Sequence, residues 1–412
     1  MDLRREFAVD VVRRLRAAGH EALWAGGCVR DGLLDRVPKD YDVATSAPPE
    51  AIRAVFGERR TLALGAAFGV ITVLGSREQG QIEVATFRQD AAYSDGRHPD
   101  RVTFSTAEHD AQRRDFTING LFYDPLAERV IDYVGGEDDL RAGVVRAIGD
   151  PDARIAEDKL RMLRAVRFAA TFSFALDEAT LHAVRRHAAE IHCVSVERIA
   201  EEMRRMLAHP ARARAVELLH ESQLLAEVLP EVHPQQSTWA EALAMLAVLG
   251  ECSFPVALAA LVRGAALDGE PGALVGEIAE RWKLSNDEAK RTAWLLLHEA
   301  SIRRAPHVAW PKLQRILIAD GAEELLLFSA AVAAVVDGEM PGIEFCREKL
   351  ALPPEVLNPP PLVTGDDLKA AGIPPGKVFR RLLEAVRDAQ LAGEIHSQNA
   401  AVERALELWR AS

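Results

Sequence analysis

The sequence has few of the features that mark membrane or disulfide-stabilised proteins. Only four of its 412 residues are cysteines, and their wide spacing without a CxxC pair argues against a zinc site or a disulfide framework. No apolar run approaches the roughly 18 residues of a membrane-spanning helix. The first residues, MDLRREFAVDVVRRLRAAGH, have a helical pattern without the apolar centre of a signal peptide. We therefore expect a cytoplasmic protein with no membrane association.

Positive charge is also scarce. The chain has 50 Lys and Arg against 62 Asp and Glu, a formal net charge of −12, which argues mildly against general nucleic-acid binding. The exception is the segment 141–214, where 14 basic residues outnumber 10 acidic ones. An RNA partner should therefore meet this middle segment, together with local basic patches.

Two kinds of structure are expected, one after the other. β-like runs are predicted at Leu23–Trp24, Tyr41–Ala44, Val70–Leu74, Gln81–Phe87, Val102–Phe104 and Val130–Tyr133, with helices at Cys28–Leu34 and Pro49–Phe56. Beyond Gly149-Asp150-Pro151 nearly every segment has helical periodicity, interrupted by proline-containing breaks. These patterns predict a small α/β unit followed by helices, with the proline cluster Pro353–Pro361 separating a final small helical unit, Gly365 to Ser412.

The most informative motif is Asp40-Tyr41-Asp42, which follows the pair Gly26-Gly27. On a strand, residues two apart project to the same side, so Asp40 and Asp42 are expected to face one cavity. Hard divalent ions such as Mg²⁺ prefer carboxylate oxygens, and a paired-metal site of this kind supports phosphoryl or nucleotidyl transfer. Glycine allows the backbone to approach a phosphate closely. Glu83, on a predicted strand, is a candidate third carboxylate, although an ordinary strand-face glutamate is as good an interpretation.

A second motif, Arg113-Arg114-Asp115-Phe116-Thr117-Ile118-Asn119, contains two adjacent guanidinium groups. Arginine is a planar, permanently charged donor suited to phosphate recognition. An isolated arginine pair more often bridges surface carboxylates. The preceding His109-Asp110 is a lone HD pair, and by itself it does not form a phosphohydrolase site.

The third motif, Glu157-Asp158-Lys159-Leu160-Arg161-Met162-Leu163-Arg164-Ala165-Val166-Arg167-Phe168, is predicted to be one helix. At about 100° per residue, Arg161, Arg164 and Arg167 share one arc, with Asp158 at its border. The opposite arc is apolar and should be buried. Three arginines at this spacing usually form a solvated face or an ion-pair ladder.

Together these three motifs resemble those of class II tRNA nucleotidyltransferases, the family of bacterial CCA-adding enzymes and poly(A) polymerases. The resemblance covers about residues 20–235. It implies an α/β nucleotidyltransferase head with a small mixed β-sheet (1–140), followed by an all-α neck (141–215), body (216–355) and tail (356–412). Glu197-Arg198-Ile199-Ala200-Glu201-Glu202 resembles the ERxxxE motif and should brace the arginine-rich helix.

The resemblance also assigns roles to individual residues. Asp40 and Asp42 would be the catalytic Mg²⁺ ligands, and Asp158 and Arg161 would read the base. The triphosphate would be held by Gly27, Arg30 and Arg114, while Arg164 and Arg167 would support the pocket or bind the nucleotide. Asp115 and Asn119 would brace the junction of head and neck. The segment Tyr93–Pro99 corresponds to a flexible loop that the family needs for switching to adenosine addition.

The chemistry of the bases explains why an aspartate and an arginine suit this reaction. Cytosine and adenine both place an exocyclic amine beside an unprotonated ring nitrogen. A carboxylate accepts from the amine while a guanidinium donates to the ring nitrogen. Uracil and guanine present the reverse pattern and would leave both side chains unpaired.

The resemblance therefore implies a template-independent enzyme that adds or repairs the CCA 3′ end of tRNA with CTP and ATP, releasing pyrophosphate. Its partners would be the tRNA 3′ end and the two nucleotides, and no protein partner is implied. Partial enzymes that add only CC or only A, and poly(A) polymerases, share the chemistry and remain alternatives. A catalytically inactive RNA-binding protein is disfavoured by the intact aspartates and arginines.

Overall fold

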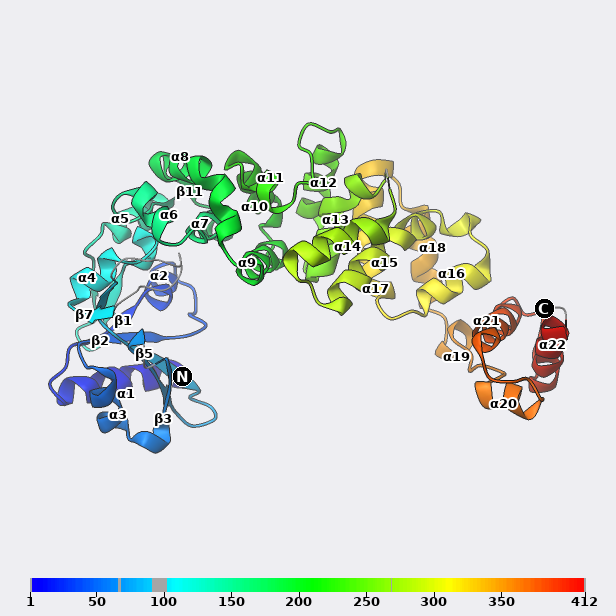
Figure 1. The fold of residues 1–412 in the computed structure, drawn as a ribbon, viewed down its shortest axis with the longest axis horizontal. Coiled ribbons are helices and arrows are strands. Elements are labelled where there is room, and N and C mark those ends of the chain that lie inside the picture. Colours follow the sequence, from blue (N-terminus) through cyan, green and yellow to red (C-terminus); the bar gives the residue numbers. More distant parts are fainter. Residues whose placement is uncertain (1, 66–67, 91–101, 268, 411–412) are drawn as a thin grey trace. The chain divides into compact units, whose positions relative to one another are not determined.

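The computed structural model describes residues 2–65, 68–90, 102–267 and 269–410 (Figure 1). The chain forms two compact units, Met1–Pro230 and Glu231–Ser412. The break at Pro230 coincides with one of the proline-containing breaks in the helical pattern. The fourfold division expected from the family stays a prediction, and its boundary at 215/216 falls within the helix α10 (Arg212–Glu221).

The first unit contains a seven-stranded mixed sheet in the order β3-β4-β5-β2-β1-β8-β9. Only β2 and β5 pair in parallel, and the other neighbours are antiparallel. The strands are β1 (Ala22–Ala25), β2 (Asp42–Thr45), β3 (Thr61–Gly65), β4 (Val70–Leu74), β5 (Gln81–Thr86), β8 (Phe122–Asp124) and β9 (Arg129–Ile131). A separate two-stranded antiparallel sheet pairs β6 (Arg88–Asp90) with β7 (Val102–Phe104). The small mixed sheet predicted for the head is confirmed.

Strand alternation separates the two faces of this sheet. On one face Leu23, Ala44 and Phe122 form an apolar core with alanines of α4 (Ala107–Gln112). On the other face Trp24 is the direct cross-strand neighbour of Val43 and Tyr123. The helix α1 (Leu3–Ala17) covers this second face, where the guanidinium of its Arg5 lies 5.5 Å from the centroid of the Trp24 ring.

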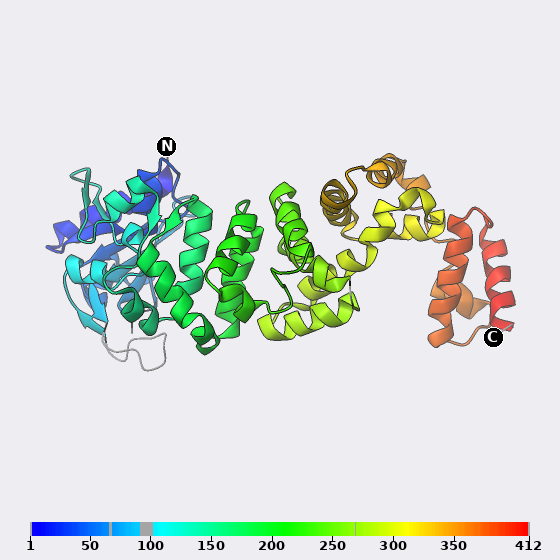
Figure 2. The ribbon, with the colours of Figure 1, turned by 90° about the horizontal axis from the view of Figure 1, so that it is seen from above.

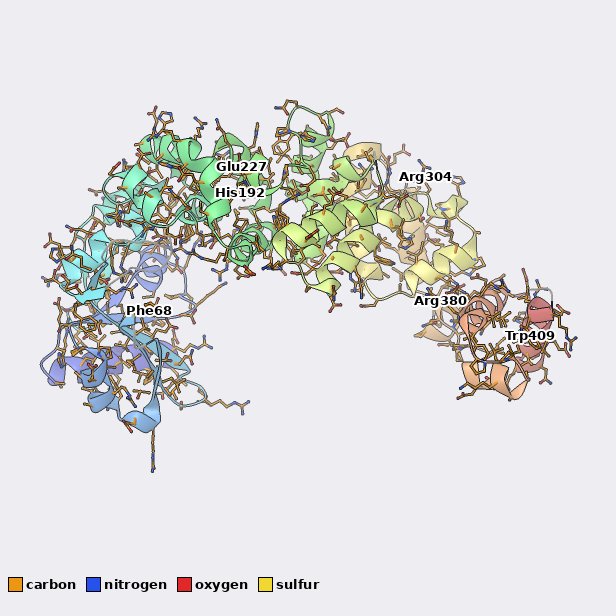
Figure 3. The ribbon with its side chains drawn as sticks, viewed as in Figure 1. Phe68, His192, Glu227, Arg304, Arg380 and Trp409 are labelled. Atoms are coloured by element: carbon orange, nitrogen blue, oxygen red, sulfur yellow. The ribbon has the colours of Figure 1, made fainter. Side chains whose placement is uncertain are left out.

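The remainder of the first unit is helical except for one parallel strand pair, β10 (Val144–Val145) with β11 (Ala175–Leu176). Its helices are α5 (Gly136–Ala142), α6 (Pro151–Glu157), α7 (Arg161–Phe172), α8 (Glu178–His187), α9 (Val196–Ala208), α10 and α11 (Leu224–Val228). His192 bonds to Glu227 of α11, with Nε2 and Oε2 2.9 Å apart (Figure 3).

One helix prediction is wrong. Residues 157–168 do not form a single helix, because α6 ends at Glu157 and α7 begins at Arg161. Asp158 has extended backbone angles, and its Oδ1 accepts a hydrogen bond from the N–H of Leu160 (3.0 Å). This local side-chain bond competes with helix formation and makes the turn between the two helices.

The second unit is entirely helical in its described residues. Its helices are α12 (Thr238–Val248), α13 (Phe254–Ala266), α14 (Pro271–Trp282), α15 (Asn286–Arg303), α16 (Trp310–Leu317), α17 (Ala322–Val332), α18 (Pro341–Leu350), α19 (Pro354–Leu357), α20 (Gly365–Ala370), α21 (Lys377–Leu391) and α22 (Gln398–Arg410). Inside it, buried Glu299 accepts from Arg263 and Arg303. Near the chain end, α21 and α22 pack side by side (Figure 2) around a core that includes Leu368 and Leu382. None of the helices in the described ranges combines the length and apolar character that a membrane crossing needs.

Candidate functional site

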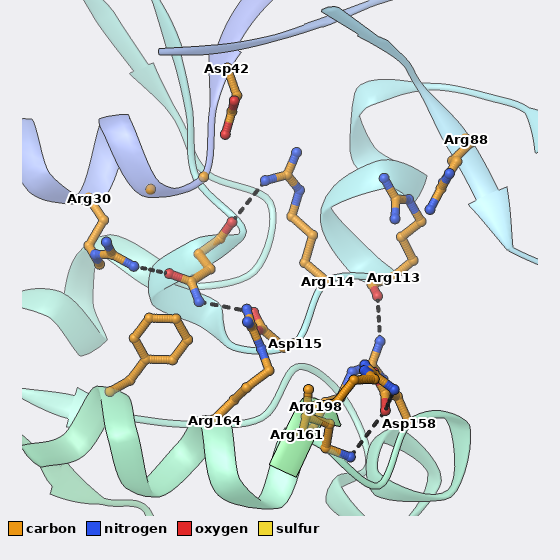
Figure 4. A pocket seen from close by; sticks show the side chains of 15 residues that line it. Arg30, Asp42, Arg88, Arg113, Arg114, Asp115, Asp158, Arg161, Arg164 and Arg198 are labelled. Carbon is orange, nitrogen blue, oxygen red and sulfur yellow. Dashed lines mark hydrogen bonds and ion pairs between the residues drawn. The ribbon is translucent and has the colours of Figure 1, made fainter. Parts of the chain in front are cut away.

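One cavity in the first unit gathers most of the residues that the motifs single out (Figure 4). It has a volume of about 610 Å³. It is lined by Gly26, Gly27, Arg30, Asp42, Arg88, Arg113, Arg114, Asp115, Asn119, Asp158, Leu160, Arg161, Arg164, Phe168 and Arg198. Seven of these are arginines and three are aspartates, a formal charge of +4. Such a surface suits a ligand that carries several negative charges.

Gly26 brings the backbone against one of these arginines. It precedes α2 (Gly27–Leu33) and has a φ of +71°, which residues with a Cβ rarely adopt. A Cβ at Gly26 would lie 2.7 Å from Nη1 of Arg114, closer than real Cβ contacts allow. The glycine therefore leaves the space that the guanidinium of Arg114 occupies.

Asp110 orients both arginines of the second motif. Its Oδ1 accepts from Nε (2.9 Å) and Nη2 (2.7 Å) of Arg113, and its Oδ2 accepts from Nε (3.2 Å) and Nη2 (2.9 Å) of Arg114. Burial would raise the pKa of Asp110, but the charges of Arg114 and Arg113 outweigh it and hold that pKa below its ordinary value. Sequence reasoning gave Asp110 no role, although residues three and four apart are the usual partners of helical ion pairs.

Asp42 opens β2 and reaches the cavity (Figure 4). Glu83 is its register partner on β5. The two carboxylates therefore project from neighbouring positions to the same side of the sheet. Burial, then the charge of Glu83, raises the pKa of Asp42 to about 6, while Arg114 opposes this shift and Asp40 adds to it.

Asp40 is placed differently from Asp42. It precedes β2, is exposed, and lines a separate smaller cavity. Because the strand begins at Asp42, the strict alternation expected from the sequence does not extend back to Asp40. Neither Asp40 nor Glu83 is among the described residues that line the larger cavity.

The carboxylates of Asp42 and Glu83 fit a divalent cation that is bound together with a substrate. In the described part of the chain, no three His, Cys, Asp or Glu side chains converge into a complete metal site. Mg²⁺ is usually held by one or two carboxylates and by substrate phosphates rather than by an all-protein cage. Asp42 and Glu83, whose repulsion contributes to the raised pKa of Asp42, match such an incomplete donor set.

Asp158 and Arg161 meet at one end of the cavity, where both already have protein partners (Figure 4). Asp158 accepts from Nη1 (3.2 Å) and Nη2 (2.7 Å) of Arg198, in α9. Arg161 donates to Glu157 (2.5 Å) and to the backbone oxygens of Arg154 (2.8 Å) and Arg113 (3.1 Å). A base bound here would meet a carboxylate whose orientation is set by Arg198.

Asp115 ties the second motif to α7. It accepts from Nε (2.9 Å) and Nη2 (2.6 Å) of Arg164 and from Nδ2 of Asn119 (3.0 Å). Burial would raise the pKa of Asp115, but the charge of Arg164 and these bonds lower it to about 2. Asn119 in turn accepts from Nη1 of Arg30 (2.6 Å), whose guanidinium lies 4.5 Å from the centroid of the Phe172 ring. The expected bracing by Asp115 and Asn119 corresponds to these contacts.

Arg167 has a partner away from the cavity. Its Nε donates to Glu202 of α9 (2.5 Å), and Arg167 is not among the described residues that line the cavity. With the Arg198–Asp158 pair, this contact gives the ERxxxE motif the bracing position expected of it.

The predicted apolar arc of α7 is also confirmed, since Met162, Leu163 and Val166 are fully buried. The segment Tyr93–Pro99 lies outside the described residues.

Comparison with known proteins gives the class of this protein first. The family model described as the poly A polymerase head domain matches residues 22–146, and that of the probable RNA and SrmB-binding site of polymerase A matches residues 173–236. The first unit is therefore a nucleotidyltransferase head with its adjoining helices. A CCA-adding enzyme of Geobacillus stearothermophilus is 33% identical over 396 residues, which cover 95% of this chain and 94% of that protein. The chain belongs to the family of CCA-adding enzymes.

Further relatives agree with this assignment. The CCA-adding enzyme of Lactobacillus helveticus is 40% identical over 237 residues, which are 55% of this chain and 58% of that protein. The crystal structure of the Bacillus stearothermophilus CCA-adding enzyme in complex with CTP has a TM-score of 0.79, with 29% identity and coverage of 100% of both chains. A Thermotoga maritima CCA-adding enzyme complexed with tRNA has a TM-score of 0.67 at 18% identity, covering 98% of this chain and 95% of that one, and supports the fold alone.

Proposed function

We propose that this enzyme adds CMP and AMP, from CTP and ATP, to the 3′ end of tRNA and so completes or repairs the CCA terminus. The single observation that carries the proposal is the cavity that brings Asp42, Arg114, Asp158 and Arg161 together. The RNA 3′-hydroxyl attacks the α-phosphorus of the nucleotide, and the bond to the leaving pyrophosphate breaks in line. The proposal includes the cytoplasmic location that the sequence predicts.

The triphosphate occupies the arginine-rich part of the cavity. Arg114 is aimed there because Asp110 and the backbone oxygen of Asn119 hold three of its nitrogens. Gly27, at the start of α2, lets the chain come close to the phosphates, and Arg30 adds charge from the same helix. Arg164 and Arg167 support the pocket through Asp115 and Glu202.

Asp42 is the catalytic carboxylate of the transfer reaction. Asp40 and Glu83 are further candidate ligands of Mg²⁺. When bound, the ion would supply charge stabilisation to the attacking and leaving oxygens. Asp42 would hold this ion, and Arg114, whose charge acts on Asp42, would add a second positive group. The protein's part is therefore positioning and electrostatics.

The base is selected by Asp158 and Arg161. The amine of cytosine or adenine donates to Asp158, and its ring nitrogen accepts from Arg161. Since Asp158 is already paired with Arg198, a correct base adds a contact to a fixed carboxylate. Uracil and guanine would place an acceptor against that carboxylate.

The decisive experiment uses tRNA lacking zero, one, two or three terminal nucleotides, each incubated with one nucleoside triphosphate at a time. We expect CTP alone to add two nucleotides to the tRNA lacking three and one to the tRNA lacking two, ATP alone to add one nucleotide only to the tRNA lacking one, and neither to extend the complete tRNA. Addition of C alone or A alone would identify a partial enzyme, and unlimited A addition a poly(A) polymerase. The Asp42→Asn variant is the control for metal-dependent incorporation.

A further inference from the structure

A group of basic side chains gathers outside the catalytic cavity. Arg36 and Lys39 belong to the loop between α2 and β2, and His209 lies at the corner between α9 and α10. Arg36 and Lys39 are exposed, and His209 is half-buried. None of the three is among the described residues that line the catalytic cavity. We call these three residues the basic cluster.

The members of the basic cluster lie close enough for their charges to act on one another. Burial lowers the pKa of His209, and the charges of Arg212, Arg36 and Lys39 lower it further. Arg212 opens α10 and is fully buried. His209 therefore lies in a positive potential to which two parts of the chain contribute, the loop before β2 and the start of α10.

The positive charges of the exposed cluster residues are not balanced by carboxylates. In the part of the chain that the structure describes, neither Arg36 nor Lys39 forms an ion pair, although Asp35 and Asp40 are exposed in the same loop. The arginines of the catalytic cavity differ in this respect, since aspartates pair with Arg30, Arg113, Arg114, Arg164 and Arg198. Like charges that are close together and lack counter-ions repel one another, and an external polyanion would offset this repulsion.

Contacts other than ion pairs hold two members of the basic cluster in place. The guanidinium carbon of Arg36 lies 5.0 Å from the ring centroid of Phe172, at the end of α7. Nδ1 of His209 accepts from the backbone N–H of Ala211 (3.1 Å). The neutral imidazole therefore carries its proton on Nε2, which is left as a donor. The guanidinium of Arg36 and the Nε2–H of His209 are thus positioned before any ligand arrives.

We propose that the basic cluster binds the phosphate backbone of the RNA close to its reacting 3′ end. The proposal rests on the function proposed above, in which tRNA is the polyanion. Lys39 precedes Asp42 by three residues, which span at most about 10 Å of backbone. A strand whose 3′ end reaches Asp42 therefore comes within reach of this loop. Arg36 and Lys39 each bind a phosphate, and Nε2–H of His209 donates to a phosphate oxygen.

Three kinds of variant separate these contacts. The double variant Arg36→Gln with Lys39→Gln removes both charges and keeps polar side chains. His209→Asn keeps an acceptor for the N–H of Ala211 and removes Nε2. Arg59→Gln is the matched control, because Arg59 is an exposed arginine of the head that forms no ion pair in the described ranges and does not act on the pKa of His209.

The experiment measures the Kd of tRNA lacking its three terminal nucleotides over a range of salt concentrations, with the full chain and no nucleotide. One lost phosphate contact lowers the slope of log Kd against log salt by roughly one. The double variant should therefore lower the slope by about two and weaken binding roughly tenfold or more at about 0.1 M salt. At about pH 8, where a histidine is neutral, His209→Asn should weaken binding about fivefold with little change of slope. Arg59→Gln should match wild type.

The KM for CTP separates an RNA site from a nucleotide site, and we expect it to stay unchanged in all these variants. Unchanged Kd and slope in a folded double variant overturn the inference. A change confined to the KM for CTP also overturns it, because the basic cluster would then hold the nucleotide. If the wild type fails to incorporate CMP while the double variant still shows the loss of slope, the proposed function fails and the RNA-binding surface stands.

Discussion

Replacing Gly26 by alanine perturbs the catalytic cavity through a single methyl group. The new Cβ would stand 2.7 Å from Nη1 of Arg114, at a backbone φ of +71°. The guanidinium is the end of a flexible side chain, so it can move aside. In doing so it leaves the place from which Nη1 donates to the oxygen of Asn119 at 3.1 Å.

Two separate effects follow, and each has a magnitude. The unfavourable backbone conformation should lower the free energy of unfolding by about 2 kcal/mol, which for a unit of this size lowers Tm by roughly 4–8 °C. Displacement of Arg114 should remove one charge-assisted hydrogen bond to the triphosphate, worth about 1.5–3 kcal/mol, so kcat/KM for CTP should fall roughly 10- to 100-fold.

Gly19→Ala is the matched control. Gly19 also has a positive φ, of +87°, but a Cβ there meets no described atom within 4 Å. This variant should lose comparable stability and keep its activity. The assay compares Tm and single-nucleotide incorporation of CTP for both variants. If the two variants lose stability equally and incorporate CTP equally well, Arg114 is not positioned through Gly26 and the reasoning fails.

Three further outcomes are expected. Asp42→Asn should abolish incorporation in Mg²⁺ without lowering Tm, because it relieves repulsion with Glu83; near-normal turnover would remove Asp42 from the metal site. Asp158→Ala or Arg161→Ala should raise UTP and GTP use relative to CTP and ATP by roughly tenfold or more, about 1–3 kcal/mol of discrimination; weakened RNA binding with unchanged selectivity would contradict base reading. The pKa of Asp115 is lowered from 3.8 to about 2, so its ionised form stabilises the fold above pH 3.8, by about 2 kcal/mol, and loses this effect as the pH falls towards 2. Stability curves of wild type and Asp115→Asn should therefore converge over that interval, and parallel curves would refute the assignment.

Local patterns predicted those elements whose own residues decide the conformation. The strand Val70–Leu74 and the helix Pro49–Phe56 have the predicted bounds, since one is a short run rich in β-branched residues and the other begins with proline. The strand β8 was missed, because three residues before a proline carry little pattern and Phe122–Asp124 becomes a strand by pairing with β1. Its existence depends on a tertiary partner.

The residues of the site also fall into those that local sequence patterns predict and those that depend on tertiary contacts. Motif spacing identified Asp42, Arg114, Asp158 and Arg161, which do line one cavity. The pairing of Asp158 with Arg198, 40 residues away, is a contact between two helices that no local spacing reveals. Asp110 could have been found, because it precedes Arg113 and Arg114 by one helical turn, the usual spacing for an ion pair.

The two bonds from α7 to the second motif have a consequence for fidelity. Arg161 holds the backbone of Arg113, and Arg164 holds Asp115, so Arg114 lies between two points of attachment to the helix that carries the base reader. A base that shifts Arg161 must therefore strain the segment that aims Arg114. Selection against a wrong nucleotide would then register as a slower transfer step as well as weaker binding. Substitutions at Arg114 and Arg161 should accordingly show a coupling energy in a double-mutant cycle, rather than simple additivity.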